Sequence, residues 1–292
     1  MLNKRKLEQE IDLVKSLRMI SQAYEEISVM KMQKIRNSVV NTRQFMEKLA
    51  GVFGDVRTSY AQQIRIMIRK KKIKDISQFT TFNKNGKTVS VLLSANTKLY
   101  GDIISRTYRL FEGAIAKEKT DIIIIGRLGK ELFDRTHAGW NYDYFEVPDM
   151  DFTVEDLKPV IAKIANYEKV MVYYGKFENI VTQNPVSMNI TGTQNLENLI
   201  KEGAGDRLQF LFEPQLEKIL SFFETQLFSS FFKQTACEGQ LARFASRITA
   251  MEEALQNIDG RLKSLNQEGR RLRRYLENRK QLGTVAGFAL WK

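Results

Sequence analysis

The 292-residue chain has one cysteine, one histidine and four prolines. The single cysteine, Cys237, excludes an internal disulfide and a cysteine-based zinc site, and it favours a reducing cytosolic compartment. We expect Cys237 to be a packing residue, because it falls on an extrapolated apolar helix position. His137 stands in a turn-like Thr-His-Ala-Gly stretch and is expected on a surface loop. With so few ligands for a transition metal, we predict no metal site.

The chain also lacks a run of about 18 apolar residues that would cross a bilayer. The nearest stretch, the phenylalanine-rich segment 222–232, is interrupted by Glu224 and Gln226. Basic residues at 4–6 run into acidic residues and not into an apolar core, so we predict no signal peptide.

Phosphate-binding motifs are missing, both G-x-G-x-x-G and G-x-x-x-x-G-K-[ST]. The closest approach, Gly126-Arg-Leu-Gly129, is interpreted as an ordinary turn from strand to helix. Asp149 and Asp151 have the chemistry for acid/base work or metal binding, but Pro148 and the lack of a nearby histidine favour a loop. We find no candidate nucleophile with a general base placed to activate it. We therefore predict no catalytic residue and no cofactor.

The strongest pattern that is present occupies residues 214–290. Apolar residues recur there at alternating steps of three and four, which is the a/d seam of a coiled coil. The seam consists of Leu241, Phe244, Ile248, Met251, Leu255, Ile258, Leu262, Leu265, Leu272 and Leu276, with Gly269 at one further position. A single helix of this length would extend for roughly 115 Å. Such a helix must project from any globular domain of this chain, and it needs a partner along its seam.

A second helical pattern, free of proline, covers residues 2–68. Two apolar sets keep steps of three and four, with a phase slip between them that is typical of a coiled-coil stutter. The first set is Leu13, Leu17, Ile20, Ala23, Ile27 and Met30, and the second is Met46, Leu49, Phe53, Val56 and Tyr60. We expect this segment to pair antiparallel with the C-terminal helix, since the residues between the two would form a compact domain at one end.

The middle of the chain alternates between strand and helix patterns. The continuous apolar runs at 88–94 and 121–126 are typical of strands buried on both faces of a parallel sheet. Further candidates are strands at 142–147, 169–174 and 207–212, and helices at 99–117 and at 154–166 with Thr153 as its N-cap. This alternation predicts a small doubly wound α/β sheet.

Three parts are therefore predicted. They are an N-terminal coiled-coil helix at 1–74, a central α/β domain at 75–206, and a C-terminal strand with a coiled-coil helix at 207–292. The net charge of +12 is concentrated in the helical parts, because residues 1–74 hold 17 Lys and Arg against 7 Asp and Glu, and Arg270, Arg271, Arg273 and Arg274 are nearly consecutive. Such blocks indicate an acidic partner or a solvated helix face.

Two segments near the chain ends carry motifs of a known family. Residues 20–32 read ISQAYEEISVMKM, and residues 245–257 read ASRITAMEEALQN. They resemble I-T-K-A-M-E-M-V-x-x-x-K-M and A-A-R-M-x-A-M-x-x-A-x-x-N of the gamma subunit of rotary F-type ATP synthases. When the family sequence is aligned onward from residues 245–257 without a gap, its V-S-G falls on Val285-Ala-Gly287. The resemblance covers essentially the whole chain.

Three departures from the family indicate a divergent branch. Residues 94–102, SANTKLYGD, keep only the Ser, the Leu and one Gly of S-S-D-R-G-L-C-G-G. The family's S-E pair is Ala242-Arg243 here. Residues 270–278, RRLRRYLEN, retain only the Arg of N-x-x-R-Q-A-x-I-T, as Arg273.

The resemblance implies an antiparallel coiled coil with an inserted Rossmann-like α/β domain, and a mechanical, non-catalytic role. Such a subunit is the rotor shaft inside a hexamer of alpha and beta subunits, and its foot stands on the membrane ring of c subunits beside an epsilon-like subunit. Ion flow, of protons or sodium, turns the shaft. The resemblance implies a peripheral place on the cytoplasmic face of the inner or plasma membrane. The implied partner contacts are Ile20, Ala23, Tyr24, Glu25, Ile27, Lys31, Arg247, Met251, Arg270, Arg273, Arg274, Val285 and Gly287.

Two other classes stay open at this point. A basic coiled-coil adaptor or nucleic-acid-binding protein fits the charge, but the few aromatic residues in the basic blocks fall at seam-like positions and do not form a stacking platform. We therefore predict no nucleic-acid partner. A nucleotide-dependent enzyme with coiled-coil arms has less support, because a phosphate loop is missing.

Overall fold

The computed structural model describes residues 4–59, 85–191 and 216–289, which belong to two compact units. One unit is Met1–Val29 with Arg247–Lys292, and the other is Met30–Ser246. The elements are α1 (Lys4–Ser59), β1 (Thr88–Leu93), α3 (Ile103–Ile115), β2 (Asp121–Ile125), α4 (Arg127–Thr136), β3 (Asp143–Phe145), α5 (Val154–Ile164), β4 (Lys169–Phe177), β5 (Gln183–Asn189) and α7 (Leu216–Ala289). The predicted strand at 207–212 and the predicted boundaries at 74/75 and 206/207 lie outside the described residues.

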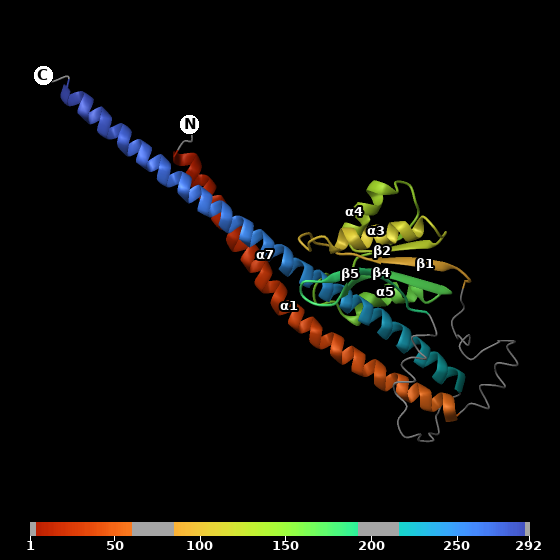
Figure 1. The fold of residues 1–292 in the computed structure, drawn as a ribbon. Coiled ribbons are helices and arrows are strands. Elements are labelled where there is room, and N and C mark those ends of the chain that lie inside the picture. The colour runs from red at the N-terminus through yellow and green to blue at the C-terminus, as the bar shows by residue number, and fades with distance from the viewer. Residues whose placement is uncertain (1–3, 60–84, 192–215, 290–292) are drawn as a thin grey trace. The chain divides into compact units, whose positions relative to one another are not determined.

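The strands of the larger unit form one sheet in the order β3-β2-β1-β4-β5 (Figure 1). The first four run parallel, and β5 is antiparallel to β4. The continuous apolar runs at β1 and β2 take the central positions, where both faces of a strand are covered. The predicted mixed α/β fold with long terminal helices is confirmed.

Helices cover both faces of the sheet. On one face α3 and α4 pack through Phe111 and Phe133 against Leu92 and Ile124. On the other face Val160 of α5 and Phe232 of α7 pack against the β1 and β4 side chains. The C-terminal helix is therefore part of the core of this unit.

Helix α3 begins at Ile103, four residues later than predicted. Leu99 and Gly101 have positive φ angles of 73° and 60°, so the backbone cannot be helical there. Helix α5 begins as predicted after Thr153, whose backbone N–H and hydroxyl both donate to the Asp156 carboxylate. A carboxylate in this position satisfies a free backbone donor at the helix start.

A third apolar cluster joins α1 to the larger unit. Ile35 of α1 packs with Ala95 and Tyr100 from the loop after β1, and with Leu241 and Phe244 of α7. Cys237 is buried in this cluster, and burial raises the pKa of its thiol, so its predicted packing role is confirmed.

Within the described ranges, we find no helix that combines the length and the apolar character of a membrane span.

Candidate functional site

The smaller unit is an antiparallel pair of helix segments. Arg261 of α7 donates to Glu10 of α1 at 2.5 Å, and Arg18 donates to Asp259 at 2.8 Å. Further along α1, the guanidinium of Arg247 lies over the ring of Tyr24, 5.6 Å from its centroid. Since the partner number on α7 falls as the number on α1 rises, the two segments run in opposite directions, as predicted.

The predicted seam of α7 is largely confirmed. Leu241, Phe244, Ile248, Met251 and Leu265 are buried, and Leu255, Ile258, Leu262 and Leu272 are half-buried. Leu276, by contrast, is 42% exposed. The seam thus weakens toward the C-terminal end of the helix.

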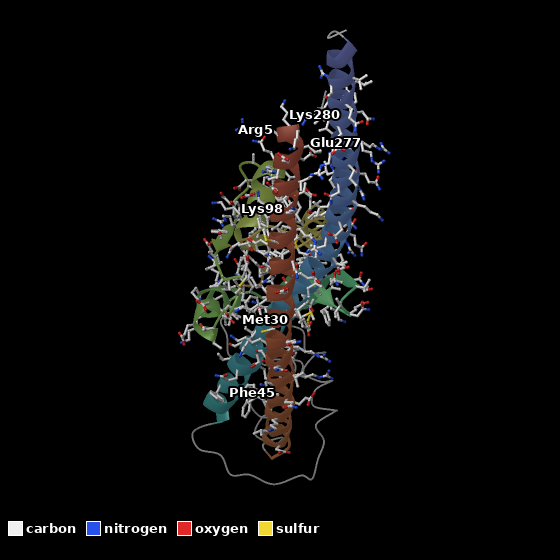
Figure 2. All side chains as sticks on the ribbon, turned by 90° about the vertical axis from the view of Figure 1, so that its left-hand side faces the viewer. Arg5, Met30, Phe45, Lys98, Glu277 and Lys280 are labelled. Carbon is white, nitrogen blue, oxygen red and sulfur yellow. The ribbon has the colours of Figure 1, made fainter. Side chains whose placement is uncertain are left out.

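The predicted first seam of α1 is wrong. Leu13, Leu17, Ile20, Ala23, Ile27 and Met30 are all exposed, and Figure 2 shows Met30 on the surface of the helix. The residues turned inward are Leu7, Ile11, Val14, Ser21, Glu25 and Ser28, followed at the same steps by Met32, Ile35, Val39, Thr42, Met46, Leu49 and Phe53. The inward stripe therefore has no phase slip, and of the second predicted set Met46, Leu49 and Phe53 do face inward.

The inward stripe of α1 includes the polar residues Ser21, Glu25 and Ser28, and the facing helix carries a buried cation. Arg247 is only 1% exposed, and a buried guanidinium needs polar or aromatic neighbours. Ser28 is fully buried and satisfies its hydroxyl by donating to the Tyr24 carbonyl at 2.6 Å. A search for apolar periodicity misses a polar seam of this kind.

The apolar residues of α1 lie instead on an exposed face. At about 100° per residue, Gln9, Leu13, Ser16, Leu17, Ile20, Ala23, Tyr24 and Ile27 share one arc of the helix without a charged residue. We call this arc the uncharged face. Leu13 is 60% and Ile20 is 53% exposed. Contiguous exposed apolar side chains of this kind are typical of interaction sites.

The other exposed surface of the smaller unit is cationic. Arg270, Arg271, Arg273 and Arg274 are all exposed around Leu272, which is half-buried. A groove of about 530 Å³ lies beside them, and Figure 2 shows Lys280 and Glu277 of α7 near Arg5 at the start of α1. Its lining residues are Lys4, Leu7, Glu8, Ile11, Asn266, Gly269, Arg270, Leu272, Arg273, Leu276, Glu277 and Lys280.

The remaining predicted contact residues are placed differently. Arg247 and Met251 are buried within the chain, Glu25 is half-buried, and Lys31 is engaged with Asp151. Val285 is 67% exposed, whereas Gly287 lies outside the residues whose exposure is described. Their contact with a partner stays a prediction.

The carboxyl edge of the sheet, where doubly wound folds bind nucleotides, is closed by the chain itself. The first backbone N–H groups of α4 would be the donors to a phosphate. Here the N–H of Arg127 donates to Oδ1 of Asn96 at 3.0 Å, and the N–H of Leu128 donates to the Ala95 carbonyl at 2.8 Å. A Cβ on Gly126 would lie 2.8 Å from the Ala95 nitrogen. The interpretation of this segment as an ordinary strand-to-helix turn is confirmed.

This geometry predicts that the isolated chain does not bind nucleotide. Calorimetric titration with ATP and magnesium should give no binding heat, because the amides that would hold a phosphate are already paired. Micromolar affinity for the purified chain would contradict the assignment.

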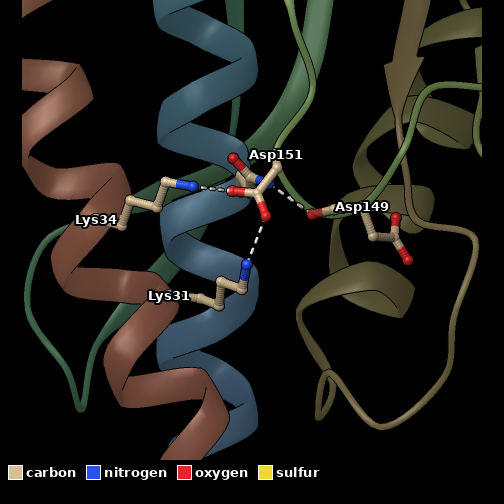
Figure 3. Close-up of polar contacts among 5 residues, drawn as sticks. Lys31, Lys34, Asp149 and Asp151 are labelled. Atoms are coloured by element: carbon tan, nitrogen blue, oxygen red, sulfur yellow. Dashed lines mark hydrogen bonds and ion pairs between the residues drawn. The ribbon is translucent and has the colours of Figure 1, made fainter.

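The two predicted loop carboxylates also have structural partners. Asp149 is buried, and its carboxylate accepts hydrogen bonds from the N–H groups of Asn96 and Thr97 and from the Thr97 hydroxyl. Asp151 accepts from Nζ of Lys31 at 2.5 Å and of Lys34 at 2.6 Å (Figure 3). The hydrogen bond from Lys31 has the largest effect and that from Lys34 the next largest, and both lower the pKa of Asp151.

His137 follows α4 in a turn, as predicted, but it is not a free surface residue. Its ring stacks on Phe133 at 5.0 Å between centroids and meets Trp140 edge-on at 4.9 Å. In the described parts of the chain we find no group of three or more His, Cys, Asp and Glu residues arranged to hold a metal ion.

Residues 3–275 match the family model described as ATP synthase. The chain belongs to the ATP synthase family. It is 25% identical over 266 residues to the ATP synthase gamma chain of Symbiobacterium thermophilum, covering 88% of this chain and 87% of that relative. With the family match, this relative confirms the resemblance to the gamma subunit, a non-catalytic part of the central stalk.

Solved ATP synthase structures share the fold. A chain in the central stalk and c-ring structure of the Tetrahymena thermophila mitochondrial ATP synthase matches with a TM-score of 0.56 and 17% identity, over 80% of this chain and 99% of that chain. A chain of the Euglena gracilis mitochondrial ATP synthase matches with a TM-score of 0.51 and 14% identity, over 88% of this chain and 93% of that chain.

Proposed function

We propose that this chain is the central rotor shaft of a proton- or sodium-driven F-type ATP synthase. In this role it couples rotation of the c-subunit ring to ATP synthesis or hydrolysis in a hexamer of alpha and beta subunits. The antiparallel pairing of α1 and α7, fixed by the contacts of Glu10 and Arg18, carries the proposal. Two paired helices resist bending and twisting better than one, which a shaft under torque requires.

The two exposed surfaces of the smaller unit suit different parts of that hexamer. The uncharged face of α1, with Ile20, Ala23, Tyr24 and Ile27, would meet an apolar lining, since an uncharged arc forms no ion pair that would hold one rotational position. The arginines at 270–274 would meet acidic loops, with Arg273 in the role of the retained family arginine. Arg247 and Met251 are buried, and Arg247, which lies over the ring of Tyr24, would position the uncharged face.

The remaining partners would be the c-subunit ring and an epsilon-like subunit, and the complex would place this chain peripherally on the cytoplasmic face of the membrane. The membrane-facing contacts would belong to the larger unit, because the hexamer would enclose the helix pair of the smaller unit. The deciding experiment is isolation of the native complex, followed by assays of ATP hydrolysis and ion pumping with and without this chain. A complex that pumps ions normally without the chain would contradict the proposal.

The cationic surface yields a prediction of its own. Each arginine contributes only about 0–1 kcal/mol as an exposed ion pair, so single Arg→Ala changes should be mild. Changing Arg270, Arg271, Arg273 and Arg274 together to Gln should weaken assembly or coupled pumping. High salt should weaken the wild-type complex in the same way, because it screens exposed pairs.

The matched control removes four charges from the α/β domain. Its substitutions are Arg109→Gln, Lys117→Gln, Lys119→Gln and Arg135→Gln, all at exposed positions. Pumping in the reconstituted complex should be unchanged in this control. Equal pumping by both four-fold variants would mean that the arginines at 270–274 are only a solvated face.

A further inference from the structure

Asp151 occupies an unusual backbone position. Its φ angle of 51° lies in the left-handed region, which non-glycine residues seldom adopt, although Asp and Asn tolerate it. From there its carboxylate contacts two lysines of α1 at once, Lys31 and Lys34 (Figure 3). These lysines are three residues apart and thus share one face of the helix. We call the three residues the Asp151 cluster.

The backbone beside Asp151 is firmly held. The Asp149 carbonyl accepts a hydrogen bond from Nε2 of Gln240 at 2.6 Å, and Gln240 of α7 is only 3% exposed. The Asp149 carboxylate is tied to the loop after β1 through Asn96 and Thr97. The Asp151 cluster therefore joins α1 to a segment that is itself fixed to both α7 and the sheet.

The two long helices are attached to the larger unit in different ways. Helix α7 contributes Phe228, Phe232 and Ala236 to the main core under the sheet. Helix α1 contributes Ile35 to the smaller cluster, with Met32 and Val39 partly buried at its edge. The hydrophobic effect is non-directional, so it sets the register of two packed helices less specifically than an ion pair between named atoms does. Two ion pairs to one carboxylate fix the rotation and the axial position of α1.

We propose that Asp151 is a positioning residue that fixes α1 to the α/β domain through Lys31 and Lys34, so that torque reaches both helices of the shaft. This inference rests on the proposed function. Without the Asp151 cluster, α7 would still turn with the domain, whereas α1 would be held to the domain mainly by apolar contacts and would otherwise follow through its own pairing with α7 at Glu10 and Arg18.

The test variant is Asp151→Asn. Asparagine tolerates the left-handed backbone as aspartate does, so the change removes the charge without a new backbone strain. The matched control is Asp143→Asn. Asp143 pairs with Lys163 at 3.0 Å and its side chain is 45% exposed, against 46% for Asp151, but both partners lie inside the α/β domain.

Hydrogen exchange of the full-length isolated chain gives the first measurement. Amides of α1 around residues 31–38 should exchange roughly three- to tenfold faster in Asp151→Asn than in the wild type, as expected for losing two partly exposed ion pairs. The control should leave these amides unchanged. High salt should produce the same acceleration in the wild-type chain.

A charge exchange separates the ion pairs from mere packing. The double variant Lys31→Glu with Lys34→Glu places three carboxylates together and should accelerate exchange of the same amides. Adding Asp151→Lys should restore their protection, although Asp151→Lys alone should impair it. Failure of the triple variant to restore protection would count against the Asp151 cluster.

The reconstituted complex gives the functional measurement. Asp151→Asn should lose ion pumping per ATP hydrolysed while hydrolysis persists, whereas Asp143→Asn should match the wild type. If the wild-type chain itself fails to support pumping, the rotor function is wrong. If the wild type pumps and the two variants behave alike in both exchange and pumping, the role of Asp151 is wrong and the rotor function stands.

Discussion

Leu265→Asp is expected to abolish stable pairing of the two helix segments in the smaller unit. Leu265 is fully buried at a seam position of α7. An aspartate there would place a carboxylate without a partner in an apolar seam, which costs about 3–5 kcal/mol. That is a large fraction of the stability of an ordinary domain. The urea midpoint followed by circular dichroism should fall, and the complex should fail to assemble.

The matched change is Leu13→Asp, which puts the same charge on the uncharged face of α1. Leu13 is 60% exposed, so the urea midpoint should stay near that of the wild type. If the uncharged face meets an apolar lining in the hexamer, assembly or pumping should nevertheless suffer. A large loss of stability in Leu13→Asp would instead restore the seam that the apolar pattern predicts. The two variants thus distinguish a buried seam position from a surface position that contacts a partner.

The seam of α1 shows where sequence patterns reach their limit. Apolar side chains at Leu13, Leu17 and Ile20 keep helical steps, so periodicity selects them as the buried face. The structure instead turns the buried Ser28 and the half-buried Glu25 inward, on the part of α1 where Tyr24 contacts the buried Arg247 of the facing helix. Which of two helical faces is buried depends on the partner helix, which a one-helix pattern does not contain.

The sheet was predictable where its strands are buried on both sides. The runs at β1 and β2 are apolar throughout, and the structure places them at the centre. Strand β5, Gln183–Asn189, escapes prediction because its sequence QNPVSMN has little apolar alternation and contains Pro185. Among the described strands it stands at the edge of the sheet and pairs with β4 alone, a position that tolerates a residue without an N–H. The strand-to-helix turn at Gly126 predicts a helix after β2, but the extent of α4 has no clear apolar pattern, since the helix buries only Gly129 and Phe133.

The long-range polar contacts had no sequence signal. Lys31 and Asp151 are 120 positions apart, and neither stands in a pattern that indicates the other. The resemblance to the gamma subunit singled out Lys31 as a contact residue, but its partner inside the chain emerges only when the fold places the loop after β3 beside α1. The fold and family were thus open to prediction, and the internal ion pairs were not.

Gly126→Ala is expected to destabilise the larger unit by about 3 kcal/mol or more, since it combines two costs. The φ angle of 98° is one that residues with a Cβ rarely adopt. The added Cβ would also lie 2.8–3.0 Å from backbone atoms of Ser94 and Ala95, which cannot yield as a flexible side chain would. The contact between Gly126 and the Ser94–Ala95 backbone, which closes the carboxyl edge of the sheet, would have to open. Chemical denaturation of the full chain, followed by its tryptophan fluorescence, measures the loss.

Gly139→Ala is the control that measures the cost of the backbone conformation without a steric clash. Gly139 has a similar φ angle of 89°, but a Cβ there would meet nothing within 4 Å. Its cost should be only about 1 kcal/mol, the ordinary penalty for a side chain in the left-handed region. The difference between the two variants then measures the loop contact between Gly126 and Ala95. If the two variants lost equal stability, the close approach of Gly126 to the Ser94–Ala95 backbone would contribute nothing to the fold.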